Sequence, residues 1–401
     1  MSNSSLPTNF RGATASSLYS TMSIVTNTTT TGITGEQCPK NQDTKFENAI
    51  KILLYVIAML VSLIGNTLLI YSVKKRKRMR TVTNFLIVNM AVADLFITVF
   101  NMPTYLKILI TQKNDWIGGP LGILLCKLVL FIQGVSVTCS VLSLTALSIH
   151  RFVSVFYPWK KLIDTRNVRY IIITIWIASC MFILPLLYAL NVIPVDNVGL
   201  VCDEKWSPLF DEEEAPKTYT IVLFVLLYMA PLLIMAVLYT ALILKLWFPS
   251  SSDVSANVSR RQSEEALSIA RVLSDEKAKS SRLSRSKKIV LKMLVTVVVV
   301  FALCWLPMHV RVFLFFFNKD DYKCGLPPFL DFIGYFLGHV NSALNPCIYV
   351  TFSESFRQSF KAVLFNKCAV RRKPKITRHY HYKGACLVEM QKLRTNIKHK
   401  K

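Results

Sequence analysis

The chain has 401 residues, of which 52% are hydrophobic, and it carries a formal net charge of +25 although only 18% of its residues are charged. Its mean hydropathy of +0.41 is high for a soluble globular protein. A basic chain could bind nucleic acid, but its Lys and Arg residues would then form one face of a folded domain. Here they gather in short stretches between apolar runs, so we expect a membrane protein with no nucleic-acid partner.

Seven apolar runs are long enough to cross a bilayer as helices, which takes about 20 mostly apolar residues. Strands of a membrane barrel would be about half as long. The predicted fold is therefore an all-α membrane protein, a bundle of seven transmembrane helices within residues 48–352. In chain order the runs are 52–73, 84–110, 121–156, 170–193, 218–248, 289–317 and 328–352.

Basic segments alternate along the chain and set the expected orientation. Residues 74–80, 157–169, 248–288 and the tail from 352 hold most of the 48 Lys and Arg residues. Such segments stay in the cytoplasm by the positive-inside rule. We therefore expect a multi-pass protein with an extracellular N-terminus and a cytoplasmic C-terminus.

The N-terminal tail, residues 1–47, is polar and shows no signal peptide, so the first span is expected to act as the insertion signal. Asn3 and Asn27 begin glycosylation triplets in this tail and are predicted to carry glycans. Asn257 begins another triplet. It lies in the predicted third cytoplasmic loop, about residues 249–287, and should stay unmodified.

The ten cysteines show no spacing typical of a metal site. Cys126 begins the third span and Cys202 lies in the second outer loop, so both face an oxidising compartment where a bridge can persist. Cys38 and Cys324 are the other outward pair. They either form a second bridge or are two unrelated thiols.

Polar residues within the spans point to a working site, because burying them in a membrane is expensive. They are expected to form one hydrated cavity around the carboxylate of Asp94, or else each bonds only a neighbouring helix. The other members are Asn66, Ser140, Asn341, Ser342 and Asn345. Prolines within spans four to seven are expected to kink their helices, namely Pro185, Pro231, Pro307 and Pro346.

Each predicted span also carries a short motif. The motifs are Gly65-Asn66, Asp94, Cys126, Trp176, Pro231 with Tyr239, Cys304-Trp305-Leu306-Pro307 and Asn345-Pro346-Cys347-Ile348-Tyr349, and an amphipathic segment at 356–365 follows them. In this order the chain resembles the rhodopsin family (class A) of G-protein-coupled receptors, from about residue 48 to 368. The resemblance implies a short amphipathic eighth helix at 353–366 and a basic cytoplasmic tail at 367–401.

The resemblance implies roles for individual residues. Arg151, preceded by His150, would meet a heterotrimeric G protein. Trp305 with Phe301 would form the switch beneath the ligand, and Tyr239 and Tyr349 would stabilise the active state. Asn345 and Pro346 belong to the same switch.

The resemblance further implies no required cofactor but an allosteric sodium ion, held by Asp94, Ser140, Asn341 and Asn345. It pairs Cys126 with Cys202 as the outer disulfide. Cys368 would be palmitoylated, and with the basic residues after it would hold the tail on membrane lipid.

The ligand class is suggested by the outer half of the chain. Amine receptors of the family carry an Asp seven residues after the third-span cysteine, where this chain has Gln133, and opsins carry a seventh-span Lys that is missing here. Gln133 resembles receptors of the neuropeptide Y, neuropeptide FF and orexin type. The residues expected to line the pocket are Tyr105, Gln133, His309, Tyr335 and His339.

Electrostatics favours a basic or C-terminally amidated neuropeptide. Residues 192–217 contain seven acids, including Asp203 and Glu204, which we expect to contact the ligand. The alternative is a solvated loop that is acidic only because basic residues are kept inside.

The third cytoplasmic loop and the end of the third span bear on regulation and on alternative functions. Ser263 ends the motif Arg260-Arg261-Gln262-Ser263 and is predicted to be phosphorylated, so that an arrestin would bind the third cytoplasmic loop. Where most family members have Asp/Glu-Arg-Tyr, this chain has His150-Arg151-Phe152, which leaves open a decoy receptor that binds ligand without G-protein signalling. The third alternative is a transporter, channel or intramembrane enzyme, and the sequence shows no internal repeat, paired catalytic carboxylates or metal-ligand cluster to support it.

Overall fold

The computed structural model describes residues 43–159, 164–195, 199–247, 268–317 and 328–364, with the side chains of helix residues 268–286 left aside. The described residues up to Phe360 belong to one compact unit. Of the second unit, residues 361–401, only the last turn of one helix is described. The fold below is that of the first unit.

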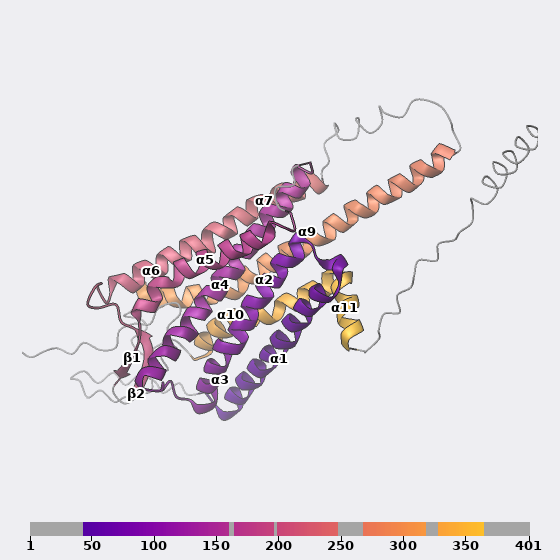
Figure 1. The fold of residues 1–401 in the computed structure, drawn as a ribbon. Coiled ribbons are helices and arrows are strands. Elements are labelled where there is room, and N and C mark those ends of the chain that lie inside the picture. The colour runs from indigo at the N-terminus through magenta and orange to yellow at the C-terminus, as the bar shows by residue number, and fades with distance from the viewer. Residues whose placement is uncertain (1–42, 160–163, 196–198, 248–267, 318–327, 365–401) are drawn as a thin grey trace, which may run out of the picture. The chain divides into compact units, whose positions relative to one another are not determined.

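Long helices lying side by side make up this unit (Figure 1). They correspond to the seven predicted runs and confirm the predicted helical bundle. In chain order the elements are α1 Lys45–Lys75, η1 Lys77–Met79, α2 Val82–Phe96, η2 Ile97–Asn101, α3 Met102–Thr111, α4 Gly119–Phe156, α5 Val168–Ala189, β1 Leu190–Val195, β2 Gly199–Glu204, α6 Glu214–Phe224, η3 Val225–Met229, α7 Ala230–Trp247, α9 Ser268–Phe317, α10 Pro328–Phe352 and α11 Glu354–Leu364.

The first helix begins earlier than its apolar run because a polar cap fixes its start. Thr44 Oγ1 accepts a hydrogen bond from the Glu47 backbone N–H at 3.2 Å, and the Glu47 carboxylate accepts from the Thr44 N–H at 2.8 Å. This reciprocal pair satisfies two backbone donors that a helix start leaves free. The helix therefore begins at Lys45, before the bilayer-length apolar stretch.

Six described helical segments are long and apolar enough to cross a membrane: Lys45–Lys75, Val82–Thr111, Gly119–Phe156, Val168–Ala189, Glu214–Trp247 and Lys287–Phe317. The seventh run, α10, is more polar because it contains His339, Asn341 and Asn345. These side chains are buried against the rest of the bundle, since α10 packs on α1 and α9. Its polar side chains thus face protein and not lipid.

Two π turns interrupt the second and fifth runs, and each precedes a proline. A proline in a helix clashes with the carbonyl group four residues earlier and cannot bond to it. For Pro103 that carbonyl belongs to Val99 in η2, and for Pro231 to Leu227 in η3. The wider π turns relieve this conflict where it arises. Pro185, Pro307 and Pro346 lie inside α5, α9 and α10.

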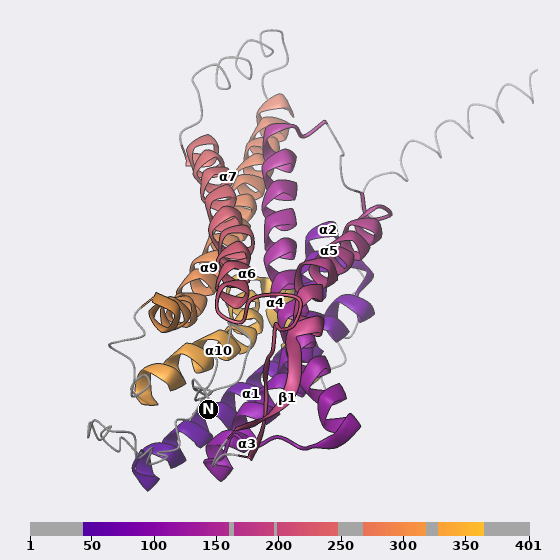
Figure 2. The same cartoon turned by 90° about the vertical axis from the view of Figure 1, so that its left-hand side faces the viewer.

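A small antiparallel sheet departs from the all-helical expectation. β1 pairs with β2 so that Val192 is opposite Cys202, and β1 lies against α4 (Figure 2). The fourth span was predicted to continue to residue 193, but α5 ends at Ala189. Residues before a proline avoid the helical region, and Pro194 follows two β-branched residues that favour strands.

The sixth helix also extends beyond its predicted run. α9 begins at Ser268, so its first turns occupy part of the predicted loop 249–287. Residues 268–287 contain neither Gly nor Pro and are rich in Ala, Leu, Lys and Arg, which are good helix formers. The amphipathic eighth helix is present as α11, Glu354–Leu364.

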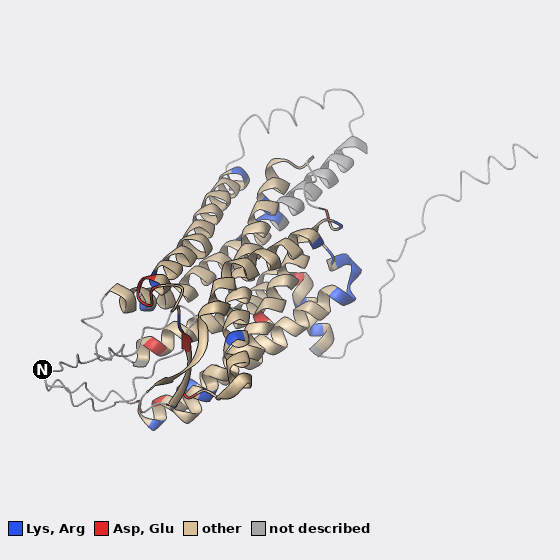
Figure 3. Ribbon diagram, turned by 60° about the vertical axis from the view of Figure 1, so that its left-hand side comes forward, with Lys and Arg blue, Asp and Glu red and all other residues tan. Residues whose placement is uncertain are grey.

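Charged residues differ between the two ends of the bundle (Figure 3). Lys and Arg crowd the connection from α1 to α2. Acids gather around the hairpin formed by β1 and β2 and at the start of α6. Large apolar side chains on the outer helix faces are exposed, for example Leu53, Ile177 and Val237. This distribution suits a bundle surrounded by lipid.

Candidate functional site

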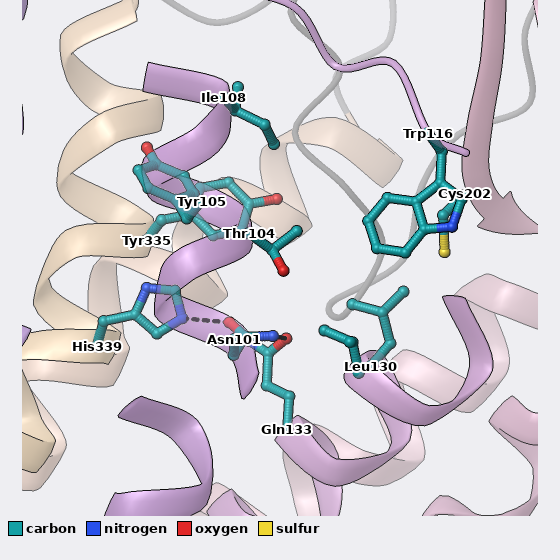
Figure 4. Close-up of a pocket in the computed structure, with 11 residues that line it drawn as sticks. Asn101, Thr104, Tyr105, Ile108, Trp116, Leu130, Gln133, Cys202, Tyr335 and His339 are labelled. Atoms are coloured by element: carbon teal, nitrogen blue, oxygen red, sulfur yellow. Dashed lines mark hydrogen bonds between the residues drawn. The ribbon is translucent and has the colours of Figure 1, made fainter. Parts of the chain in front are cut away.

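A pocket opens below the hairpin, between the second, third and seventh runs (Figure 4). Among the described residues that line it, none is charged. They are Asn101, Thr104, Tyr105, Ile108, Trp116, Val129, Leu130, Gln133, Cys202, Tyr335 and His339. Four of the predicted ligand residues, Tyr105, Gln133, Tyr335 and His339, therefore lie in one pocket.

The hairpin is fixed over this pocket from two sides. A disulfide joins Cys126 at the start of α4 to Cys202 in β2, with the two Cα atoms 5.6 Å apart, which confirms the predicted bridge. On the other side, the Trp116 N–H donates to the Leu200 carbonyl at 2.6 Å, and its indole Nε1 donates to the Gly122 carbonyl at 2.9 Å. The lid of the pocket is thus held by covalent and hydrogen bonds.

A hydrogen-bonded chain crosses the floor of the pocket. Gln133 Oε1 accepts from Asn101 Nδ2 at 2.6 Å, and Asn101 Oδ1 lies 2.6 Å from His339 Nε2. The other ring nitrogen of His339, Nδ1, is hydrogen-bonded to the Tyr55 hydroxyl. Sequence reasoning missed Asn101 and Tyr55, although polar residues in apolar runs were the signal that could have found them.

His309, predicted to line the pocket, lies elsewhere. Its ring packs against Tyr228 and Phe224, with ring centroids 4.3 and 4.9 Å apart, and it does not line the pocket. The imidazole therefore packs between α9 and the fifth run.

The two predicted acids of the hairpin are also outside the pocket lining. Glu204 is 3% exposed, and its Oε2 accepts from the Trp206 indole Nε1 at 2.8 Å. Burial, with a smaller effect of the nearby Asp203, raises the pKa of Glu204 to about 8. Asp203 Oδ1 accepts from the Glu204 backbone N–H at 2.8 Å. Both carboxyl groups thus take part in holding the hairpin.

Part of the acidic segment after the hairpin has a structural role. Asp211 Oδ1 accepts from the backbone N–H groups of Glu213 and Glu214 at 2.8 Å, and these bonds lower the pKa of Asp211. Glu212 accepts from the N–H of Ser207 at 2.9 Å; burial opposes ionisation, but this bonding outweighs it and lowers the pKa of Glu212. Glu213 and Glu214 are exposed. Asp196 lies outside the described residues.

An ion pair behind the pocket wall was not anticipated. Arg311 Nε donates to Asp331 Oδ1 at 2.5 Å, and both side chains are mostly buried. The Arg311 guanidinium also lies 4.8 Å from the ring centroid of Tyr335, which lines the pocket. The pair joins α9 to α10. An arginine inside an apolar span was the sequence signal for it.

Deeper in the bundle, Asp94 is 1% exposed and its Oδ2 accepts from Asn345 Nδ2 at 2.9 Å. Within the described part of the chain, Ser140 Oγ and Asn341 Oδ1 are buried without a hydrogen-bond partner. A hard cation takes oxygen ligands of this kind. These oxygens are of the kind that the predicted sodium site needs, and sodium binding stays a prediction.

The predicted switch residues lie on α4, α7, α9 and α10. The rings of Trp305 and Phe301 have centroids 6.2 Å apart. A Cβ atom placed on Gly65 would meet Pro346 Cγ at 2.6 Å, so glycine permits the close approach of α1 and α10. The hydroxyl of Tyr349 is buried and has no partner among the described groups.

The C-terminal end of α4 lacks an ion pair within the described region. Arg151 Nε and His150 Nδ1 are buried atoms without a hydrogen-bond partner there. Tyr239 is held nearby in another way, because its hydroxyl accepts from Ser148 Oγ at 2.7 Å. The remaining predicted sites, which are Asn3, Asn27, Cys38, Ser263, Cys324 and Cys368, lie outside the described residues.

Comparison with known proteins agrees with this architecture. A family model described as "7 transmembrane receptor (rhodopsin family)" matches residues 65–349. The chain is also similar to Neuropeptide FF receptor 1 of Rattus norvegicus, with 32% identity over 327 residues, which cover 78% of this chain and 70% of that protein. The chain therefore belongs to the rhodopsin family of seven-transmembrane receptors and is not an enzyme.

Proposed function

We propose that the chain is a plasma-membrane receptor that binds an extracellular peptide and activates a heterotrimeric G protein. The pocket carries this proposal, because its lining is neutral, polar and aromatic, and Gln133 lies at its floor. Peptide groups both donate and accept hydrogen bonds, so they match such a lining better than an isolated ammonium group does. The similarity to a protein named Neuropeptide FF receptor 1 points the same way.

A basic or C-terminally amidated neuropeptide fits the charges near the hairpin. Glu213 and Glu214 are exposed at the start of α6, on the hairpin end of the bundle. Acids of one sign attract a cationic ligand and speed its encounter. This steering is weaker than the sequence suggested, because Asp211 and Glu212 are engaged in hydrogen bonds and Glu214 pairs with Lys217 at 3.3 Å.

Signalling would run through the residues below the pocket. Trp305 and Phe301 would change their packing when ligand binds, and the inner end of α9 would move away from Arg151. A sodium ion beside Asp94 would supply positive charge to the buried carboxylate in the resting state, with oxygens of Ser140, Asn341 and Asn345 around it. Arg151 would then contact the G protein.

The surrounding features belong to the same proposal. The N-terminus is extracellular and the C-terminus cytoplasmic. Arrestin binds the third cytoplasmic loop after phosphorylation, and the basic tail contacts membrane lipid. The modified residues would be Asn3 and Asn27 (glycans), Cys368 (palmitate), Ser263 (phosphate) and the pair Cys38 and Cys324 (a second disulfide).

A decoy receptor is the second candidate. It is favoured by one observation, the histidine at position 150 beside an arginine whose Nε has no partner in the described region. Such a receptor would bind and internalise the peptide without exchanging nucleotide on a G protein.

The test is a screen of cells that express the receptor against a panel of C-terminally amidated peptides. Calcium and cyclic-AMP responses absent from untransfected cells would support a signalling receptor. Saturable binding of a peptide without nucleotide exchange would support the decoy. If no peptide of the panel binds or causes a response, the proposal of a peptide ligand is contradicted.

A further inference from the structure

A run of basic residues fills the connection between α1 and α2 (Figure 3). Six of the seven residues from 74 to 80 are Lys or Arg, and the sequence has no acidic residue between Glu47 and Asp94. Among the described residues, no salt bridge includes Lys77 or Arg78. Like charges this close repel one another, because they lie within a Debye length of about 10 Å. This basic turn (residues 74–80) therefore favours an anionic partner.

The basic turn is held in a fixed shape by its neighbours. Arg76 Nη2 donates to the carbonyl of Gln358 in α11 at 3.4 Å, and Ser359 Oγ donates to Met79 Sδ at 3.4 Å. Met79 is buried, and its carbonyl accepts from Asn84 Nδ2 in α2 at 2.7 Å. The turn is thus tied to α11 on one side and to α2 on the other. A segment that is already ordered loses less freedom when it binds a ligand.

The cationic groups of the fixed turn point outward. Lys74, Lys77, Arg78 and Arg80 are exposed. Arg80 Nη2 donates to the Lys74 carbonyl at 2.7 Å, which brings the two ends of the turn together. Several cations on one turn suit a group with several negative charges, and a guanidinium matches the geometry of a phosphate. A headgroup with more than one phosphate fits this surface better than a single carboxylate does.

The position of the basic turn points to the membrane as the source of such a headgroup. Large apolar side chains on the outer face of α1, such as Leu60 and Ile64, are exposed, and so is Tyr71 at the end of this face. Tyrosine is common where a span meets the lipid headgroups. Lys75 follows one helical turn later, and its Nζ donates to the Tyr71 hydroxyl at 2.7 Å. Clusters of four to eight Lys and Arg directly after a span attract anionic lipids of the cytoplasmic leaflet.

We propose that the basic turn binds the headgroup of a phosphoinositide, a lipid whose inositol ring carries additional phosphates. Lys77 and Arg78 contact these phosphates, and the acyl chains lie along the apolar face of α1. The site is separate from the basic tail at 367–401. It goes beyond the proposed function, and rests on it only for the orientation that puts this turn on the cytoplasmic side.

The experiment measures lipid binding by the full-length receptor in detergent, where neither a peptide nor a G protein is needed. The receptor is titrated with phosphatidylinositol bisphosphate, and native mass spectrometry counts the lipid molecules bound. We expect one site that is tighter than any other. Lys77→Gln combined with Arg78→Gln should weaken it by about 25-fold, because each basic residue near anionic lipid contributes a factor of about five.

A matched control removes the same charge elsewhere on the predicted cytoplasmic side. Arg166 and Arg169 are exposed at the start of α5, and replacing both with Gln should weaken the site by less than about threefold. The tested side chains form no hydrogen bond with any described residue, so the fold should survive their replacement. Equal weakening by the two double variants would overturn the proposal, because overall charge would then explain the binding.

Two further ligands test which part of the lipid is recognised. Phosphatidylserine at the same total charge should bind more weakly, because it cannot place several phosphates on one turn; equal binding would overturn recognition of the inositol headgroup. Soluble inositol trisphosphate should compete, but more weakly than the lipid, because it lacks the chains that lie against α1. No competition would contradict a headgroup site, and binding as tight as that of the lipid would assign the turn to a soluble inositol phosphate.

A protein partner is the remaining alternative for this surface. If the Lys77 and Arg78 double variant binds the lipid like wild type but slows nucleotide exchange on a G protein, the turn contacts the G protein and the lipid site is wrong. The lipid titration is independent of the peptide screen. A failed screen would therefore contradict the peptide ligand and leave the phosphoinositide site standing.

Discussion

Replacing His150 with Asp should lower the signalling of the receptor in the absence of ligand. Arg151 Nε and His150 Nδ1 have no hydrogen-bond partner in the described part of the structure. A neutral imidazole offers one acceptor nitrogen, and a protonated one would repel the guanidinium. A carboxylate offers two acceptor oxygens and a negative charge. It would stabilise Arg151 in the resting arrangement and shift the population away from the active state.

The magnitude follows from the exposure of the two residues. A hydrogen bond to a charged group contributes about 1.5–3 kcal/mol when buried. His150 and Arg151 are only half-buried, so solvent reduces this, and we expect about 1–2 kcal/mol. That corresponds to a change of about 5- to 30-fold in the ratio of resting to active receptor. Basal activity should fall by a similar factor while the active fraction is small.

The assay is guanine-nucleotide exchange on purified G proteins by membranes with equal receptor number. His150→Asn is the matched control, because it is similar in size to Asp and neutral, and it should leave most of the basal rate. Equal basal rates for wild type and His150→Asp would refute the reasoning and show that other contacts already restrain Arg151. A silent wild type that gains a ligand response on substitution would identify a decoy.

Three further outcomes are expected. Cys126→Ala should abolish ligand binding or surface expression, measured by flow cytometry, because the hairpin loses its bond to α4; normal binding would remove that role. Glu204 has a folded-state pKa of about 8 against an ordinary value of 4.5, so its contribution to stability is complete below about pH 4.5 and is lost as the pH rises through about 8. Glu204→Gln should therefore raise the melting temperature at pH 8 more than at pH 6, and equal shifts would contradict the buried carboxyl. Replacing Glu213 and Glu214 with Gln should slow the association of a cationic peptide by a few-fold at low salt and flatten its salt dependence in stopped-flow binding; an unchanged rate would leave these acids without a steering role.

The sequence predicts the bundle and much of the pocket for a simple physical reason. Seven long apolar runs leave few arrangements in a bilayer, and helical periodicity decides which side of each helix is buried. Tyr105, Gln133, Tyr335 and His339 therefore reach one pocket as expected. His309 does not line this pocket, and its ring packs against Tyr228 instead.

Pairings between distant residues could not be read from the sequence. Tyr55 and His339 are separated by 284 positions, and nothing local marks them as partners. The hairpin was missed because Leu190–Val195 continues an apolar run, and only its pairing with Gly199–Glu204 makes it a strand. The acids after it looked like a free rim, yet Asp211 bonds backbone N–H groups at the start of α6. Such hydrogen bonds and strand pairings form only in the folded backbone, so the sequence alone does not reveal them.

The π turn η2 has a consequence for comparing this receptor with its relatives. A π turn holds one more residue than an α-helical turn, and each residue of an α-helix rotates the chain by about 100°. A relative with an uninterrupted α-helix here needs one residue fewer between Asp94 and Tyr105 to place the same side chain in the pocket. An ungapped alignment would then pair Tyr105 with a residue facing another direction. Correspondences in the outer half of this span require a one-residue gap inside Ile97–Asn101.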